Sequence, residues 1–130
     1  MKSEMTLTAV DSHTMGEPAR IVVSGPPALK GNSVAEKRDY FREHYDHLRS
    51  IVVNEPRGHS GMFAAFLTEP CDPRASAGLI FMDNKDYVNM CAHATIAAAT
   101  VLLETGKIEC NDGCAEFFFE VPLGLVKIYA

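Results

Sequence analysis

The sequence lacks an excess of basic residues, a long uncharged hydrophobic run and any internal repeat. Its 12 Lys and Arg are outnumbered by 17 Asp and Glu, so the formal net charge is −5, which argues against binding to nucleic acid or anionic lipid. The longest stretch without Asp, Glu, Lys or Arg is 87–103, which is short for a membrane span. The opening residues, MKSEMTLTAV, have no basic region before a long apolar stretch, unlike a signal peptide. We therefore expect a cytoplasmic protein whose partners include neither nucleic acid nor a membrane.

Cysteine is also scarce, with four residues in a chain of 130, the length of one domain. Nothing in the sequence points to export, so we expect free thiols. Cys110 and Cys114 flank the turn sequence Asn-Asp-Gly. A lone pair of cysteines lacks the further ligands that a structural zinc site requires, so we expect a loop there and no metal site.

Hydrophobic patterning predicts several strands and two helices. Segments rich in β-branched and aromatic residues predict strands at 6–14, 19–25, 50–54, 62–68, 77–83, 115–121 and 124–130, with a turn at 16–18. Ser33, followed by Glu36, predicts a helix that starts with a capping box. A narrow apolar stripe on this charged helix predicts a surface position with one docked face; it comprises Val34, Phe41, Tyr45 and Leu48.

The segment from Met90 to about Thr105 predicts a second helix of another kind. It is rich in Ala and Leu and has no charge before Glu104, which is typical of a buried helix. Gly106 is a plausible C-terminal stop. The strands are therefore expected to surround this helix.

A cysteine and a histidine, Cys91 and His93, lie at the start of the buried helix. Asn89 is a good N-cap and would place Cys91 in the first turn, where free N–H groups and the helix dipole would lower the pKa of the thiol. The same N–H groups would suit a substrate carboxylate. Alternatively, Cys91 is a small buried hydrophobe and His93 a hydrogen-bonded core residue, and spacing alone leaves both interpretations open.

Four stretches resemble the amino-terminal half of the proline racemase family: DSHTMGEPARIVVSG, EPRGHSGMFAAFLTEP, LIFMDNKDYVNMCAHATIAAATVLLETG and PLGLVKIYA. The family includes proline racemases, hydroxyproline 2-epimerases and trans-3-hydroxyproline dehydratases. The resemblance implies that residues 1–130 form one lobe of a diaminopimelate epimerase-like α/β fold, in which a mixed sheet wraps around a buried central helix. It also implies an active site between two lobes and no cofactor. One cysteine at the start of each central helix exchanges a proton with the substrate α-carbon.

Matched by position, Cys91 corresponds to the first catalytic cysteine of that family. Ala92 stands where the family motif usually has glycine, although its N–H group is still available to a substrate carboxylate. The resemblance and the loop sequence Pro-Arg-Gly-His together assign Ala92, His93 and His59 to the substrate pocket, and Asp83 and Tyr87 to its support.

The motif of the second lobe, similar to SPCGTGT, does not occur in this sequence. Three interpretations follow: a lobe that is inactive alone, two copies that pair so that each supplies Cys91, or a lobe that only binds an imino acid or a partner chain. The wording around Cys91 is more similar to the proline racemase branch, and a dehydratase lobe is the alternative. We expect a small-molecule substrate, proline or a hydroxyproline, and association with a second copy or a second lobe.

Overall fold

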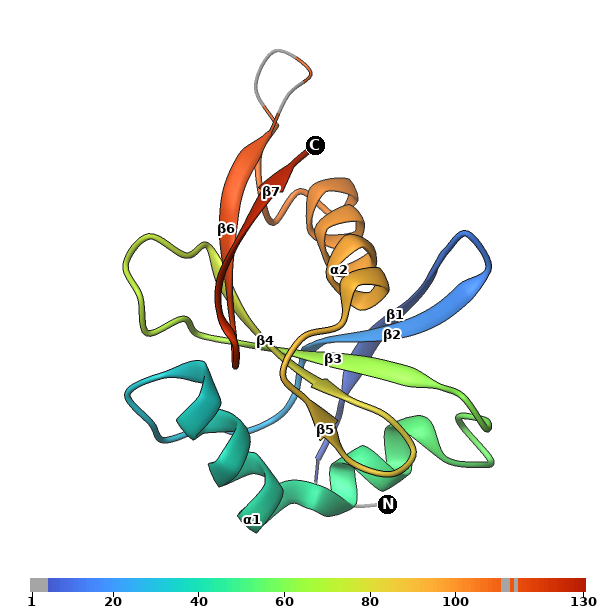
Figure 1. The fold of residues 1–130 in the computed structure, drawn as a ribbon. Coiled ribbons are helices and arrows are strands. Elements are labelled where there is room, and N and C mark those ends of the chain that lie inside the picture. Colours follow the sequence, from blue (N-terminus) through green and yellow to red (C-terminus); the bar gives the residue numbers. More distant parts are fainter. Residues whose placement is uncertain (1–4, 111–112, 114) are drawn as a thin grey trace.

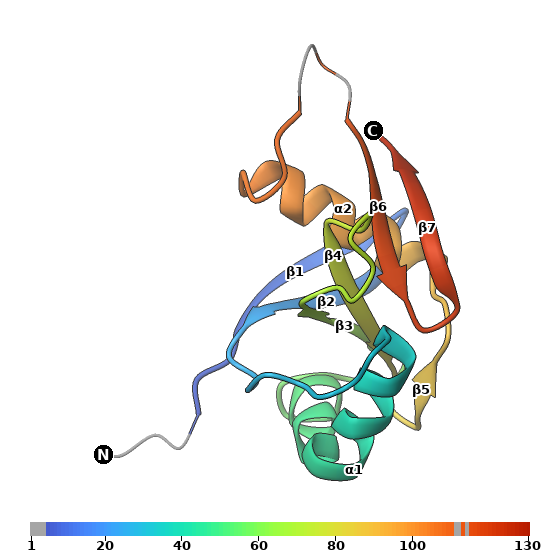
Figure 2. The ribbon, with the colours of Figure 1, turned by 90° about the vertical axis from the view of Figure 1, so that its left-hand side faces the viewer.

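The computed structural model describes residues 5–110, 113 and 115–130. Within these residues one mixed sheet separates two helices, α1 (Val34–Val53) and α2 (Ala92–Glu104), as Figures 1 and 2 show. The strand order is β1-β2-β3-β4-β6-β7, and β5 pairs with β4 outside this path. The strands are β1 (Thr8–Thr14), β2 (Glu17–Ser24), β3 (Phe63–Thr68), β4 (Ala77–Met82), β5 (Tyr87–Val88), β6 (Glu116–Val121) and β7 (Gly124–Tyr129). The predicted α/β class and mixed sheet are confirmed.

The connections explain why the helices lie on opposite faces. Strand β2 pairs in parallel with β3 across α1, and β4 pairs in parallel with β6 across α2. Because β3 and β4 are antiparallel, the second crossover starts from a reversed strand. A right-handed crossover that advances in the same direction along the sheet must then place its helix on the other face.

Both faces of the sheet are buried. Along β4, Leu79 and Phe81 belong to the core around α2, whereas Ile80 and Met82 belong to the core around α1. All four are 0% exposed. A strand with two buried faces has a continuous apolar sequence, which is how this segment reads.

The predicted boundaries hold for most elements. The turn between β1 and β2 has positive φ at Met15 (52°) and Gly16 (92°), one residue earlier than predicted. Two successive positive φ values are typical of a type I′ hairpin turn. The helix α1 starts with the predicted capping contact, in which Glu36 N–H donates to Ser33 Oγ at 3.1 Å.

The strand predicted at 50–54 is wrong, because α1 continues to Val53 after a break at Tyr45 (φ −132°, ψ 20°). Val52 and Val53 are 5% and 0% exposed and pack in the same core as Leu48. Leu48 and Val52 are four residues apart and so share one helix face. Burial of that face outweighs the strand preference of two valines.

The predicted buried helix is α2. Ala94, Ala97 and Ala98 are at most 1% exposed and pack against the sheet, while Ile96 is 54% exposed on the outer face. Gly106 has the positive φ (76°) of a C-terminal stop, as predicted. Neither helix of the described residues has the length and hydropathy that a membrane crossing requires.

Candidate active site

The start of α2 differs from the prediction, because Cys91 and not Asn89 is the N-cap residue. The backbone of Cys91 is extended (φ −139°, ψ 110°), and its carbonyl accepts the first helical hydrogen bond from Thr95 N–H at 3.0 Å. The side-chain oxygen of Asn89 accepts a hydrogen bond from Arg38 Nη1 on α1. Asn89 is therefore occupied elsewhere, and the helix begins only after Cys91.

Cys91 and His93 form a close pair at this helix start. The sulfur lies 3.4 Å from His93 Nδ1, and Cys91 is 8% exposed. The His93 ring packs edge-on against Phe63 of β3, with centroids 4.8 Å apart, and Thr14 Oγ1 of β1 donates to the His93 carbonyl at 2.9 Å. Strands β1 and β3 thus fix the histidine beside the thiol. Its Nε2 atom is buried without a hydrogen-bond partner within the described part of the chain.

Burial raises the pKa of the Cys91 thiol above its ordinary value. The backbone N–H groups of Ala94 and His93 oppose this rise although the sulfur makes no formal cap hydrogen bond, and the charge of Asp83 adds to it. The predicted lowering of the pKa is therefore wrong for this chain as it stands, because desolvation outweighs the helix start. The direction of this shift favours the thiol over the thiolate.

Ala92 and His59, both expected in the substrate pocket, occupy different settings. Ala92 is the first residue of α2, is exposed and does not have the positive φ that would require glycine. Its N–H group lies among those that lack an intrahelical partner. His59 is exposed in the loop before β3, where its Nδ1 lies 2.8 Å from Ser60 O. Its carbonyl accepts a hydrogen bond from Asn84 Nδ2 at 3.0 Å, so these two contacts of His59 stabilise the loop.

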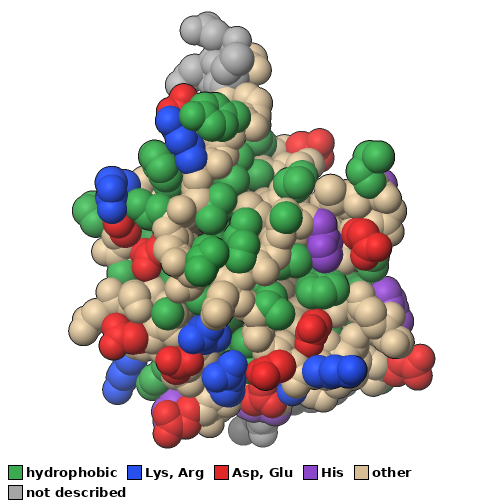
Figure 3. Space-filling model, in the orientation of Figure 1, with side chains coloured by type: hydrophobic (Ala, Val, Ile, Leu, Met, Phe, Trp, Pro, Cys, Tyr) green, Lys and Arg blue, Asp and Glu red, His purple; other side chains and the backbone are tan. Residues whose placement is uncertain are grey.

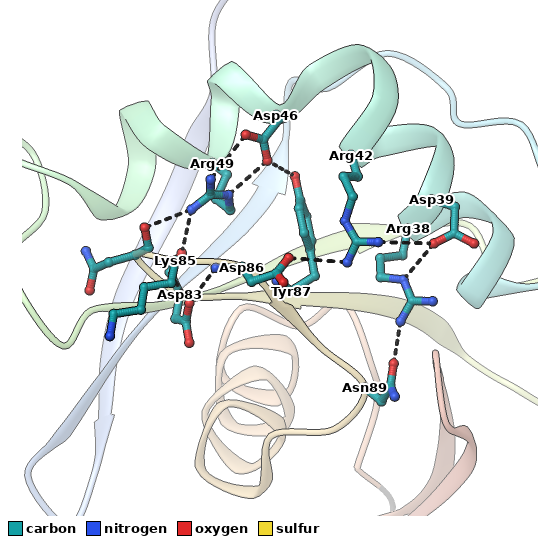
Figure 4. Close-up of polar contacts among 11 residues, drawn as sticks. Arg38, Asp39, Arg42, Asp46, Arg49, Asp83, Lys85, Asp86, Tyr87 and Asn89 are labelled. Atoms are coloured by element: carbon teal, nitrogen blue, oxygen red, sulfur yellow. Dashed lines mark hydrogen bonds and ion pairs between the residues drawn. The ribbon is translucent and has the colours of Figure 1, made fainter.

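Asp83 and Tyr87, the expected supports, fasten the segment that leads to Cys91. Asp83 Oδ1 accepts the N–H groups of Lys85 and Asp86, both at 2.8 Å, which closes the turn before β5. Tyr87 donates its hydroxyl to Asp46 Oδ1 of α1 at 2.7 Å, and Figure 4 shows this contact. The Tyr87 ring packs in the core around α1, so it supports the segment from the side opposite α2.

Sequence reasoning missed three arginines of α1 that contact this segment (Figure 4). Arg38 donates to Asn89, Arg42 Nη2 lies 3.3 Å from Asp86 Oδ1, and Arg49 Nη1 donates to the carbonyl oxygens of Asp83 and Asn84 at 3.1 and 2.9 Å. The separations of four and seven residues place all three on one helix face, and this spacing was a signal that the sequence offered.

Two cavities, of about 500 and 630 Å³, do not include the Cys91–His93 pair in their linings. Within the described residues, no three His, Cys, Asp or Glu side chains are grouped to hold a metal ion. Cys71, Cys91 and Cys110 are free thiols, while Cys114 of the predicted loop lies outside the described residues.

Comparisons with known proteins agree on one family. The family described as proline racemase matches residues 9–130. The proline racemase of Clostridioides difficile is 46% identical over 127 residues, which cover 98% of this chain and 38% of that protein. The trans-3-hydroxy-L-proline dehydratase of Bacillus thuringiensis subsp. konkukian is 42% identical over 130 residues, 100% of this chain and 39% of that protein.

Solved structures extend the similarity to three dimensions. The crystal structure of a hydroxyproline epimerase from Agrobacterium vitis, with bound trans-4-hydroxy-L-proline, matches 100% of this chain with a TM-score of 0.91 and 28% identity. The match covers 39% of that chain. This chain therefore spans about two fifths of the length of the relatives it matches.

Proposed function

Because this chain belongs to the proline racemase family and has its diaminopimelate epimerase-like fold, we propose that residues 1–130 form one lobe of a cofactor-independent isomerase. Its substrate is proline or a hydroxyproline, and Cys91 is one of two cysteines that exchange the α-proton. The observation that carries the proposal is the position of Cys91, at the N-cap of α2 and 3.4 Å from His93 Nδ1.

The proposed reaction breaks the α C–H bond on one face of the substrate and forms a new one on the other. A thiolate takes the α-proton while a thiol opposite delivers its own, so no oxidant or reductant is needed. In one direction of the reaction Cys91 starts as the thiol and is the proton donor. In the reverse direction it starts as the thiolate and is the base.

The first turn of α2 supports the charge that develops in this step. The N–H groups of Ala92, His93 and Ala94 have no partner within the helix and suit a substrate carboxylate. Fixed donors near that carboxylate stabilise the carbanion-like transition state. His93 Nδ1 contacts the thiol, and its unpartnered Nε2 is left for a polar group of the substrate.

In this mechanism the second cysteine belongs to a second copy of residues 1–130 or to a second lobe. The relatives are longer than this chain by more than half of their own length, which leaves room for such a lobe in them. Two copies about a two-fold axis would also face one Cys91 toward another across the substrate.

The test is exchange of the α-proton of L-proline in D₂O by the purified chain, followed by mass spectrometry and optical rotation. Deuterium incorporation with loss of rotation supports the proposal. Cys91→Ser must abolish both, because a hydroxyl is a far weaker acid than a thiol. Cys110→Ser, at an exposed cysteine of the described part, is the matched control and must keep full activity. Activity that survives Cys91→Ser contradicts the proposal.

A dehydratase lobe is the second candidate, favoured by 42% identity to the trans-3-hydroxy-L-proline dehydratase. In that reaction the α-proton and the 3-hydroxyl leave together as water. Incubation with trans-3-hydroxy-L-proline distinguishes it, since the product has lost the mass of one water. If calorimetry shows that proline binds while neither product forms, the chain is an imino-acid-binding lobe.

A further inference from the structure

Asn89 and Cys91 could each be the N-cap of α2, and the structure uses Cys91, the residue with the weaker N-cap preference. Asparagine is among the preferred N-cap residues, whereas cysteine is not. Asn89 precedes Cys91 by two positions, so a helix capped by Asn89 would begin at Met90. In the structure the helix begins at Ala92 instead. A contact elsewhere in the molecule must therefore withhold Asn89.

Arg38 supplies that contact from α1. The side-chain oxygen of Asn89, the atom that would accept an N–H group of the helix, accepts Arg38 Nη1 instead (Figure 4). The Arg38 side chain is 16% exposed, and its Nε is held by Asp39 Oδ1 at 3.1 Å. A guanidinium donor is charged and forms a stronger bond than a neutral backbone N–H. The Asn89 carbonyl is engaged as well, by Leu123 N–H at 3.2 Å.

We propose that Arg38 is a positioning residue that keeps Asn89 away from the start of α2 and so makes Cys91 its N-cap. Were Asn89 the cap, the N–H groups of His93 and Ala94 would bond to the carbonyls of Asn89 and Met90. The two N–H groups that lower the pKa of the Cys91 thiol in the present structure would then be bonded within the helix. The thiol would lose their effect even though it entered the first turn. The inference rests on the proposed function only in taking Cys91 as the acid/base group.

The test is the pH profile of Cys91 alkylation by iodoacetamide, measured on the 130-residue chain by peptide mass spectrometry. Arg38→Ala should slow alkylation at a fixed pH by about two- to fivefold, the size of a helix-terminus effect, and move the profile to higher pH. The double variant Arg38→Ala with Asn89→Ala should return to the wild-type profile, because alanine cannot compete for the cap. Loss of a merely structural contact would not be rescued in this way.

Arg42→Ala is the matched control. Arg42 is one helical turn from Arg38. It contacts Asp86 in the same segment and lies 3.8 Å from Asp39 Oδ1, but has no hydrogen bond to Asn89 within the described residues. Its alkylation profile should equal that of the wild type. The inference is overturned if Cys91 in Arg38→Ala is alkylated as fast as in wild type, or faster. It is also overturned if the alkylation profile of the double variant is no closer to wild type than that of Arg38→Ala. Because the assay measures the thiol and not turnover, it remains decisive if the racemisation assay fails.

Discussion

Glu120 is a buried carboxylate that connects three separate parts of the chain. It is 7% exposed, and its Oε2 accepts the N–H group of Val34 at the start of α1 at 2.9 Å. Its Oε1 accepts the N–H groups of Cys71 and Asp72, both at 2.7 Å. The carboxylate thus fixes the first turn of α1 and the loop before β4 to strand β6. Without the carboxylate, these three N–H groups would lose this hydrogen-bond acceptor.

Replacing Glu120 by glutamine should lower the free energy of unfolding at pH 7 by about 2 kcal/mol, since the new amide group turns a donor toward backbone donors. Burial raises the pKa of Glu120, but the N–H groups of Asp72, Val34 and Cys71 lower it more, so the net pKa lies below 4.5. The stabilisation is complete above the unfolded-state pKa and is lost as the pH falls through the folded-state pKa. Urea unfolding at neutral and acidic pH should therefore show a smaller pH dependence for Glu120→Gln than for wild type.

Glu116→Gln is the control for this prediction. Glu116 is an exposed residue of the same strand, paired with Lys127 at 2.7 Å. Exposed ion pairs contribute little, so the change should stay below about 0.5 kcal/mol. Equal effects of the two substitutions would contradict the role given to Glu120.

Single residues also show where sequence reasoning stops. The resemblance singled out Cys91 and His93, whereas their spacing alone left their role open. The structure places the Cys91 sulfur 3.4 Å from His93 Nδ1, and the role of Cys91 stays a prediction. The predicted direction of the Cys91 pKa shift was wrong. Burial of the thiol depends on how β1, β3 and α2 pack, and this packing cannot be inferred from the residues next to Cys91 in the sequence. The contacts of the three arginines with 83–89 were missed because they join residues 34 to 51 positions apart.

The helix α2 lies close to the sheet because small residues face it. Ala98 is 0% exposed and lies in one core with Ile21 and Phe81. Ala98→Leu should reduce the free energy of unfolding by about 1–3 kcal/mol, because added methylene groups have no space in a packed core. Thr100→Leu adds a similar bulk at an exposed position of the same helix and should stay within about 0.5 kcal/mol. Thermal unfolding of both variants measures this, and a neutral Ala98→Leu would show that the helix can move away from the sheet.

At the scale of elements, the strands that alternate or run apolar were predictable, and so was the buried helix. The failures were local patterns that distant contacts override. The valines after Ser50 have a strand sequence but complete a helix face. The two-residue strand β5 is too short for any pattern and forms because Tyr87 and Val88 pair with β4.

At the scale of the whole molecule, the face drawn in Figure 3 has an apolar part and a charged part. Figure 3 shows hydrophobic side chains over the β6–β7 hairpin and the middle of this face, while charged side chains gather around α1. Leu123 and Tyr129 are 70% and 72% exposed, and Ile96 of α2 is 54% exposed. Large exposed apolar patches are typical of association surfaces, and we predict that this face takes part in association. Such a face near the start of α2 is what a lobe needs if a second one completes its active site.

Mixing experiments decide whether a second copy supplies the other cysteine. If two chains form one site, activity per chain should rise with concentration until the dimer is saturated, and light scattering should show the dimer over the same range. Excess Cys91→Ser chain should then reduce the activity of wild type beyond dilution. Each mixed pair holds one Cys91 thiol, whereas proton exchange on both faces of the substrate needs two. Cys110→Ser chain in the same excess should not inhibit. If the wild-type chain stays a monomer without turnover, or if Cys91→Ser does not inhibit it, the second base belongs to another lobe.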